Sequence, residues 1–267
     1  MKNVLIEYKR WGFRHTHKVG VPENWHEMEP YQFLAACKLY MKEISGMGFV
    51  LEFFKLPVNV FGAMDEYTIY KLVEMVEFVQ DCRQPHNAFF MEKLPNTKLF
   101  APKEKLKDMS LQQFMTADTY YSRYVISNDE LFLNLFVAAL YLPRNTVFVR
   151  EINYEIPELM KKMPVLLDMQ QSMVAVKKLT KECRFAVFMN FLLIKNWLGG
   201  LFPYLFPKGS DSENVKIKSQ QVVNWLDIFD SFVGDNVAEM KKYQVMNCMD
   251  AFRIMNRRIK EQDKLKR

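Results

Sequence analysis

Asp118 is the residue that most invites a chemical interpretation, because it is a carboxylate in the middle of an apolar helical stripe. The surrounding segment, residues 111–124, reads LQQFMTADTYYSRY. At helical spacing the stripe consists of Leu111, Phe114, Met115, Tyr121 and Val125. A carboxylate on this side must be paired, hydrogen-bonded or protonated, since burying an unpaired charge is costly. Asp118 could therefore be a catalytic acid or base, or a structural contact between helices.

The sequence offers several partners for Asp118. By topology they are Asn134 on the following helix, Arg144 or Arg150 beyond it, or a backbone amide at a helix start. A catalytic carboxylate normally works with a second acid, a histidine or a metal. No such partner stands at a recognisable spacing, so we predict that Asp118 and Asn134 are buried structural polar residues. No residue is predicted to be catalytic.

Histidines provide the candidates for metal binding. His15 and His17 share one face of a predicted strand, because alternate strand residues point the same way. With His26 or His86 they could hold a metal, but no cysteine or carboxylate motif accompanies them. We expect the strand face to meet solvent or an acidic partner, and we expect no metal site.

Short catalytic motifs are missing from the sequence. It contains no glycine-rich phosphate loop, no G-x-S-x-G, no H-E-x-x-H and no paired C-x-x-C. We therefore expect a protein that is not an enzyme and has no cofactor.

Basic residues gather at the C-terminus. The whole chain has a formal charge of +6, and residues 253–267 hold seven basic and two acidic residues, or +5. The candidate contact residues are Arg253, Arg257, Arg258, Lys260 and Lys264. They could bind DNA phosphates, dock on an acidic protein surface, or form a solvated helix end. Aromatic residues between them would favour nucleic acid, and this segment has none from 253 onward.

Composition and periodicity identify the elements that would position these residues. The chain is 49% hydrophobic and 14% aromatic, which excludes a disordered protein. Only 9 Gly and 11 Pro in 267 residues argue against a turn-rich β-sandwich. We predict a mainly α fold: a multi-helix globular bundle with an N-terminal β-hairpin and a small extended arm.

The predicted organisation has four parts. A β-hairpin arm spans 1–22, and the main helical domain spans 23–206 with a β or loop arm near 85–108. A polar loop follows at 207–219, and a C-terminal helical pair with the basic tail completes the chain at 220–267.

Several helix boundaries follow from local signals. Pro30 suits the first position of a helix, and a helix that begins at Asp65 is predicted to extend to Cys82. Ser127 and Glu130 have the spacing of a capping box. Gly234 is expected to end a helix. The last helix is predicted to pack through an apolar seam of Val245, Cys248, Phe252, Met255 and Ile259.

Phe185 to Phe206 is apolar enough to raise the question of a membrane span. Lys195 near its centre and the Gly199-Gly200 break favour a buried helix with a turn instead. The N-terminal residues do not read as a signal peptide. We expect no membrane contact, and we expect the four scattered cysteines to be small buried hydrophobes in a reducing compartment: Cys37, Cys82, Cys183 and Cys248.

Two stretches carry a resemblance to a known family. VPENWHEMEPYQFLAACKLYM and FMTADTYYSRYVISNDELFLNLFVAALYLP resemble a helical family encoded among virion and tail genes of phages that infect Bacteroidales, the crAss-like phages included. The shared order of parts is a β entry, V-P-x-x-W, an amphipathic helix, F-x-x-A-D-x-x-Y and an apolar helix ending in Leu-Tyr-x-Pro. It spans about Val21 to Phe206. The usual Y-R-P is Tyr141-Leu142-Pro143 here, which weakens a role for an arginine at that position.

The resemblance implies a virion structural protein, with no catalytic residues to carry over and with Asp118 at the family's A-D position. Its expected role is a neck or tail ring subunit, a head–tail connector that forms a homo-oligomeric ring and binds portal or tail components. The expected location is the virion, and the host cytoplasm during assembly. The alternatives are a tail-assembly chaperone and a DNA-binding or packaging-associated protein that uses the basic C-terminal helix.

Overall fold

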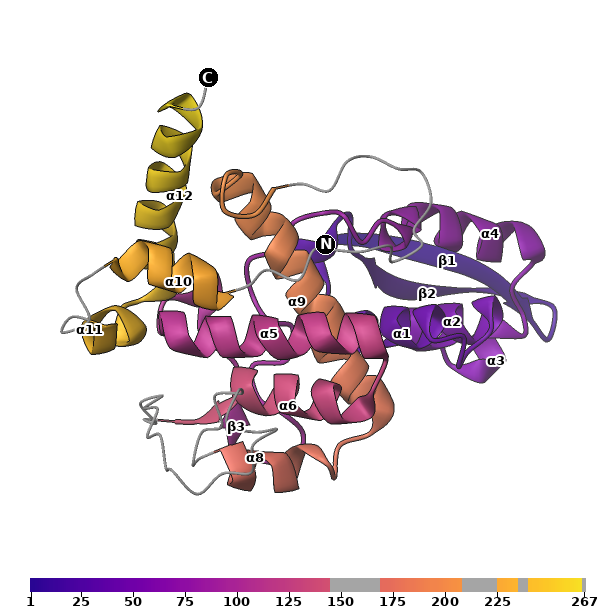
Figure 1. The fold of residues 1–267 in the computed structure, drawn as a ribbon. Helices are drawn as coiled ribbons and strands as arrows, with labels where there is room; N and C mark the ends of the chain where they lie inside the picture. Colours follow the sequence, from indigo (N-terminus) through magenta and orange to yellow (C-terminus); the bar gives the residue numbers. More distant parts are fainter. Residues whose placement is uncertain (145–168, 208–224, 235–239, 266–267) are drawn as a thin grey trace.

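The computed structural model describes residues 1–144, 169–207, 225–234 and 240–265, and its architecture is mainly α-helical with an N-terminal antiparallel hairpin (Figure 1). This confirms the predicted fold class. The predicted loop at 207–219 lies almost entirely outside the described residues, as do Arg150 and the extended segment predicted around it.

The hairpin consists of β1 (Lys2–Arg10) and β2 (Phe13–Val21), which pair along their full nine-residue lengths. Trp11 and Gly12 form the turn with φ of 51° and 84°, the two left-handed residues of a two-residue hairpin turn. Near the chain terminus one face of the ribbon is buried, through residues such as Ile6 and Val19, whereas the turn end is exposed.

Short helices follow the hairpin and lie around it in Figure 1. They are η1 (Trp25–Glu27), α1 (Pro30–Tyr40), α2 (Gly46–Phe54), α3 (Val58–Phe61), α4 (Glu66–Met75) and η2 (Glu77–Gln80). Pro30 is the first residue of α1, as predicted, and Glu29 with Gln32 forms the capping box there. The predicted helix from Asp65 to Cys82 is shorter, because α4 ends at Met75 and only a 3-10 turn continues it.

The centre of the molecule is built from three longer helices, α5 (Leu111–Ser127), α6 (Glu130–Leu140) and α9 (Lys181–Leu201). In Figure 1, α5 and α6 run as adjacent layers and α9 crosses them. Their buried aromatic rings meet directly: Phe191 of α9 lies within 6 Å of the rings of Phe114, Tyr121 and Phe136. The apolar α9 is thus a core helix. Within the described parts of the chain, no helix is both long and apolar enough to cross a bilayer.

The start of α6 differs from its prediction. Ser127 is the last residue of α5, and its hydroxyl donates to the Arg123 carbonyl and accepts from Asp129 N instead of forming the predicted capping box with Glu130. Asp129 caps α6 instead, since its Oδ1 accepts from Leu131 N at 2.8 Å. The prediction was wrong because α5 continues through the polar residues that had suggested a new helix start.

The segment at 85–108 is not a projecting arm. It contains β3 (Leu99–Phe100) and η3 (Glu104–Leu106), and β3 pairs with β4 (Leu142–Pro143), far along the chain. Asn190 of α9 accepts from Phe90 N at 2.8 Å and donates to Ala88 O at 2.9 Å. The segment therefore packs along the helical core. This packing could not be predicted from its two prolines and its weak periodicity.

The remaining helices are α8 (Met169–Val176), α10 (Trp225–Val233), α11 (Met240–Val245) and α12 (Cys248–Leu265). Gly234 ends α10 at φ 62°, as predicted. The predicted last helix is two helices, because Asn247 uses its side chain to bind the carbonyls of Lys107 and Met109 and its backbone pairs with Ser110. Val245 thus falls outside the seam. The C-terminal part of α12 extends away from the body in Figure 1.

Candidate functional site

The Asp118 cluster, consisting of Asp118, Lys195 and Trp225, joins three helices in the core. Lys195 Nζ of α9 lies 2.8 Å from Asp118 Oδ1, and Trp225 Nε1 of α10 donates to Asp118 Oδ2 at 2.8 Å. Oδ1 makes this ion pair without an aligned hydrogen bond. Asp118 is only 1% exposed, and Trp225 is 3% exposed. A carboxylate on the apolar face of α5 is therefore tolerated because an ammonium and an indole N–H compensate its burial.

Aromatic rings surround this cluster and help to stabilise its buried charges. Lys195 Nζ lies 4.8 Å from the ring centroid of Tyr121, a cation–π distance. The indole of Trp225 packs edge-on to Phe114 at 5.6 Å and beside Phe252 at 6.1 Å. Low-polarity rings on these sides strengthen the attraction between the two charges, because few water molecules screen it.

Within the described residues, neither Asn134 nor Arg144, two of the predicted partners, pairs with Asp118. Asn134 accepts a 2.6 Å hydrogen bond from Arg184 of α9, and Arg184 also lies 3.5 Å from Glu130. Arg144 lies over the ring of Phe100 at 4.3 Å. The sequence did contain a signal for the true partner: Lys195 is the one charged residue inside the apolar segment 185–206, and such a charge needs a counter-charge.

The arrangement is poorly suited to acid–base chemistry. The Lys195 side chain is 15% exposed, whereas the carboxylate that it meets has almost no contact with solvent. Burial and the Asp118 carboxylate raise the pKa of the adjacent Tyr121 hydroxyl well above its usual range, which disfavours proton transfer near neutral pH. The chemistry that these side chains support is the joining of α5, α9 and α10.

A second polar pair joins His26 and His86, two residues predicted only as possible metal ligands. Their Nδ1 atoms lie 3.0 Å apart, and the His86 ring stacks on Phe90 at 4.4 Å. Burial, followed by the neighbouring His26, lowers the pKa of His86 to about 4. A His86 ring that is uncharged at neutral pH can share one N–H with the His26 ring.

His15 and His17 do not join this pair. They lie on one face of β2, as predicted, and His15 stacks on Tyr8 across the hairpin at 5.5 Å. Among the described residues, no group of three or more His, Cys, Asp or Glu side chains is arranged to hold a metal ion.

All four cysteines are free thiols. Cys37, Cys183 and Cys248 are buried in helices, whereas Cys82 is half-buried in the turn after η2, outside the helix predicted for it. Burial raises the pKa of each thiol, that of Cys183 to about 11. A thiol that stays protonated is a weak nucleophile, so these residues serve as small apolar side chains.

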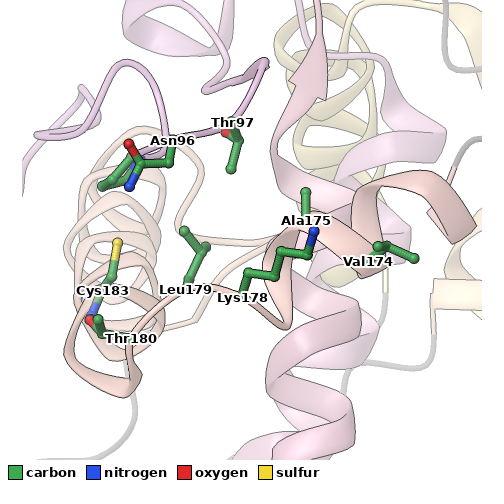
Figure 2. A pocket seen from close by; sticks show the side chains of 9 residues that line it. Asn96, Thr97, Val174, Ala175, Lys178, Leu179, Thr180 and Cys183 are labelled. Carbon is green, nitrogen blue, oxygen red and sulfur yellow. The ribbon is translucent and has the colours of Figure 1, made fainter.

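A pocket of about 380 Å³ lies between the turn around Asn96 and the α8–α9 junction, with Lys178, Leu179 and Cys183 on its wall (Figure 2). Its hydroxyls are already engaged: Thr97 donates to Leu94 O, and Thr180 caps α9 by accepting from Cys183 N. The protonated thiol and the single lysine do not form an acid–base pair, so the pocket does not indicate a reaction.

The basic residues of α12 are in different situations. Arg258 donates to Phe232 O at 2.6 Å and covers the Phe232 ring, so it joins α12 to α10. Arg253 and Arg257 lie near acids of their own helix, Asp250 at 3.3 Å and Glu261 at 4.0 Å. Residues 260–265, which include Lys260 and Lys264, are all exposed. Of the predicted contact residues, Arg258 is therefore structural and the end of the helix is accessible.

The comparisons with known proteins give no further guide to the site. The chain matches no protein-family model, no curated protein and no solved structure.

Proposed function

We propose that this protein is a structural subunit that acts by protein–protein assembly, and that its role is a neck or tail ring subunit, the head–tail connector of a phage virion. The single observation that carries the assembly role is the exposed turn end of the N-terminal hairpin. This end presents Trp11 at 86% exposure and Phe13 at 72%, although most of the other large aromatic rings of the described chain are buried. Exposed aromatic side chains at such a turn are typical of a contact surface.

The character of the core supports this proposal. The most suggestive candidate for chemistry, Asp118, is engaged on both carboxylate oxygens by Lys195 and Trp225. A helical body joined in this way suits a rigid subunit that presents arms to its neighbours.

The assembly proposal is tested on the purified full-length chain. Light scattering after size exclusion, followed by negative-stain microscopy, is expected to show a closed ring of identical subunits. A ring that binds a portal complex would support the connector role. A chain that stays monomeric up to about 100 μM, a concentration far above the Kd of stable complexes, would contradict it.

The alternative of a tail-assembly chaperone shares the helical fold but predicts a different fate. A connector remains in the finished particle, whereas a chaperone leaves it. Mass spectrometry of purified virions would detect the chain at a stoichiometry matching a ring in the first case. Its presence in infected-cell lysate but absence from virions would favour the chaperone.

A DNA-binding role rests on a separate observation, the exposed basic end of α12 at residues 260–265. Cutting the chain after Ile259 removes these residues and retains Arg258, which contacts Phe232. If this role is correct, the cut weakens DNA binding and lowers its salt dependence, because fewer counterions are released. Unchanged binding after the cut would exclude it.

A further inference from the structure

The hairpin tip is defined as residues 8–15. One face of the hairpin is buried against the rest of the chain near residues 4–6 and 19, and the tip continues this face into solvent. Val4, Ile6 and Val19 lie on this face and are buried or half-buried. Further out, the same face carries Tyr8, Phe13 and His15, and here exposure increases towards the turn. An aromatic sheet face that continues beyond its own core has the form of a binding surface.

Trp11 gives independent support, because its backbone conformation is unfavourable for its residue type. It occupies the first left-handed position of the turn with φ 51°, where asparagine, aspartate or glycine is preferred. Its indole is 86% exposed, and the Arg10 guanidinium lies 4.7 Å from the ring centroid. A bulky residue in a strained, solvent-facing position contributes little to the fold, which suggests a role in binding.

The hairpin tip is also basic. Residues 2–21 hold five basic residues and one acidic residue, a formal charge of +4. Lys9, Arg10 and Arg14 lie next to the turn. The partner of this tip should therefore be acidic and should offer aromatic or apolar surface.

A surface of this kind exists on α4 of the same molecule. The α4 face, defined as Glu66, Tyr67, Tyr70 and Glu74, lies opposite the buried Leu72 at helical spacing. Tyr67 and Tyr70 are 69% and 64% exposed. Residues 65–77 hold four acidic residues and one basic residue, a formal charge of −3.

The hairpin tip cannot bind the α4 face of its own chain. Its rings are exposed in the folded protein, and β1 and β2 pair along their full lengths, so the tip is fixed to its own ribbon and is not covered within the chain. We propose that the hairpin tip of one copy binds the α4 face of a second copy. This inference rests on the proposed assembly function and names the contact that would produce it.

Charge complementarity favours a second copy over nucleic acid. Lys71 of α4 pairs with Glu74 at 2.8 Å and lies 5.7 Å from the Tyr67 ring, yet the α4 face stays exposed and net acidic. Phosphates would attract the hairpin tip equally well, but they would leave the α4 face without a partner outside its own helix. A second copy accounts for both surfaces, and tyrosine with arginine is the combination enriched in protein interfaces. The hairpin turn and α4 lie towards the same side of the molecule in Figure 1. If each interface contains one contact between a tip and an α4 face, the assembly is head-to-tail and closes as a ring. If each interface contains two reciprocal contacts, the assembly is a two-fold dimer.

The test is a charge exchange on the full-length chain, read by light scattering and sedimentation. Arg10→Glu with Arg14→Glu, and separately Glu66→Lys with Glu74→Lys, should each weaken assembly at least about tenfold, because like charges then meet across the contact. Equimolar mixing of the two charge-reversed chains should restore assembly, since the reversed tip then meets a reversed face. Trp11→Asn should also weaken assembly while keeping a favourable turn.

The matched control is Lys2→Glu with Lys18→Glu, the same charge change on the hairpin but away from the tip. It should leave assembly unchanged. Circular dichroism confirms that each exposed substitution leaves the fold intact.

The outcomes separate this inference from the proposed function. An assembly that ignores the tip and face substitutions overturns the inference and leaves the ring proposal in place. A charge-sensitive dimer supports the inference and contradicts the ring. A monomer that binds an oligo(dT) strand through the hairpin tip overturns both and makes the tip a nucleic-acid site.

Discussion

The Asp118 cluster and the hairpin tip contain the same kinds of groups in opposite surroundings. Lys195 lies 4.8 Å from the ring of Tyr121 in the core, and Arg10 lies 4.7 Å from the ring of Trp11 in solvent. In the core, the tryptophan N–H and the ammonium both meet Asp118. At the tip, no carboxylate of the described chain is paired with Arg10.

This difference shows how burial changes what similar contacts can do. In the core, removing one partner leaves a charge or an N–H without compensation, so each group is needed for stability. At the tip, water compensates the charge and the same contact stabilises the fold only weakly. The buried cluster therefore specifies the packing of helices, whereas the tip is free to bind a partner.

The largest effect should come from removing the buried acid. Asp118→Ala leaves Lys195 unpaired in the core and Trp225 without its acceptor, and it should destabilise the protein by about 3–5 kcal/mol. Urea unfolding followed by circular dichroism measures this loss.

A matched double variant separates lost charge pairing from lost packing. Asp118→Asn with Lys195→Met keeps an acceptor for Trp225 and removes both charges, so it should recover most of the lost stability. If the double variant is as unstable as Asp118→Ala, the ion pair is not the reason that Asp118 matters.

A smaller effect is expected for the indole N–H. Trp225→Phe keeps an aromatic ring beside Phe114 but leaves Asp118 Oδ2 without its donor, which should cost about 1.5–3 kcal/mol. Trp25→Phe is the control, because the Trp25 indole donates to a neutral carbonyl, Asp81 O, at a longer 3.3 Å. Its loss should be smaller, about 0.5–1.5 kcal/mol. Equal losses would show that the carboxylate adds nothing to the bond.

The His26–His86 pair, intermediate in burial between the two regions, should make stability depend on pH. The folded pKa of His86, about 4, lies below its ordinary value of 6.5, so the unfolded chain binds the proton first as pH falls. The stabilisation is complete above pH 6.5 and is lost as the pH falls towards 4, by up to about 3 kcal/mol.

Denaturation midpoints measured from pH 7.5 to 4 test this dependence. His86→Phe keeps a ring to stack on Phe90 and should flatten the curve in that window, relative to the wild type. Substitution of the exposed His15 by Gln should leave the slope unchanged. The same carboxyl groups are present in the wild type and in both variants, so the difference between the curves isolates His86.

Local sequence signals predicted the secondary structure of both regions. Of the two sites, they predicted part of the Asp118 cluster and did not predict the hairpin tip as a binding surface. The start of α1 at Pro30 and the end of α10 at Gly234 follow from single residues and their preferred backbone angles. The burial of Asp118 also followed from its place in an apolar stripe.

The partners of Asp118 could not be predicted in the same way. Trp225 is 107 residues away, and its position depends on how α10 crosses α5, which periodicity does not specify. The pairing of β3 with β4 could not be predicted either, because the two short strands are far apart in the sequence. The hairpin tip was predicted as an arm, but its contrast with the α4 face became visible only when exposure was known for each side chain.

The smallest effect on stability should come from the tip itself, which makes it the sharpest contrast with Asp118. Trp11→Asn removes an exposed ring and places a preferred residue at the left-handed turn position, so stability should change by less than about 0.5 kcal/mol or rise slightly. Gly12→Ala is the matched change on the next residue. Its φ of 84° strains any side chain, so it should cost about 1 kcal/mol although nothing crowds its Cβ. A large loss for Trp11→Asn would mean that the indole stabilises the fold, and the strained position would then need no partner to explain it.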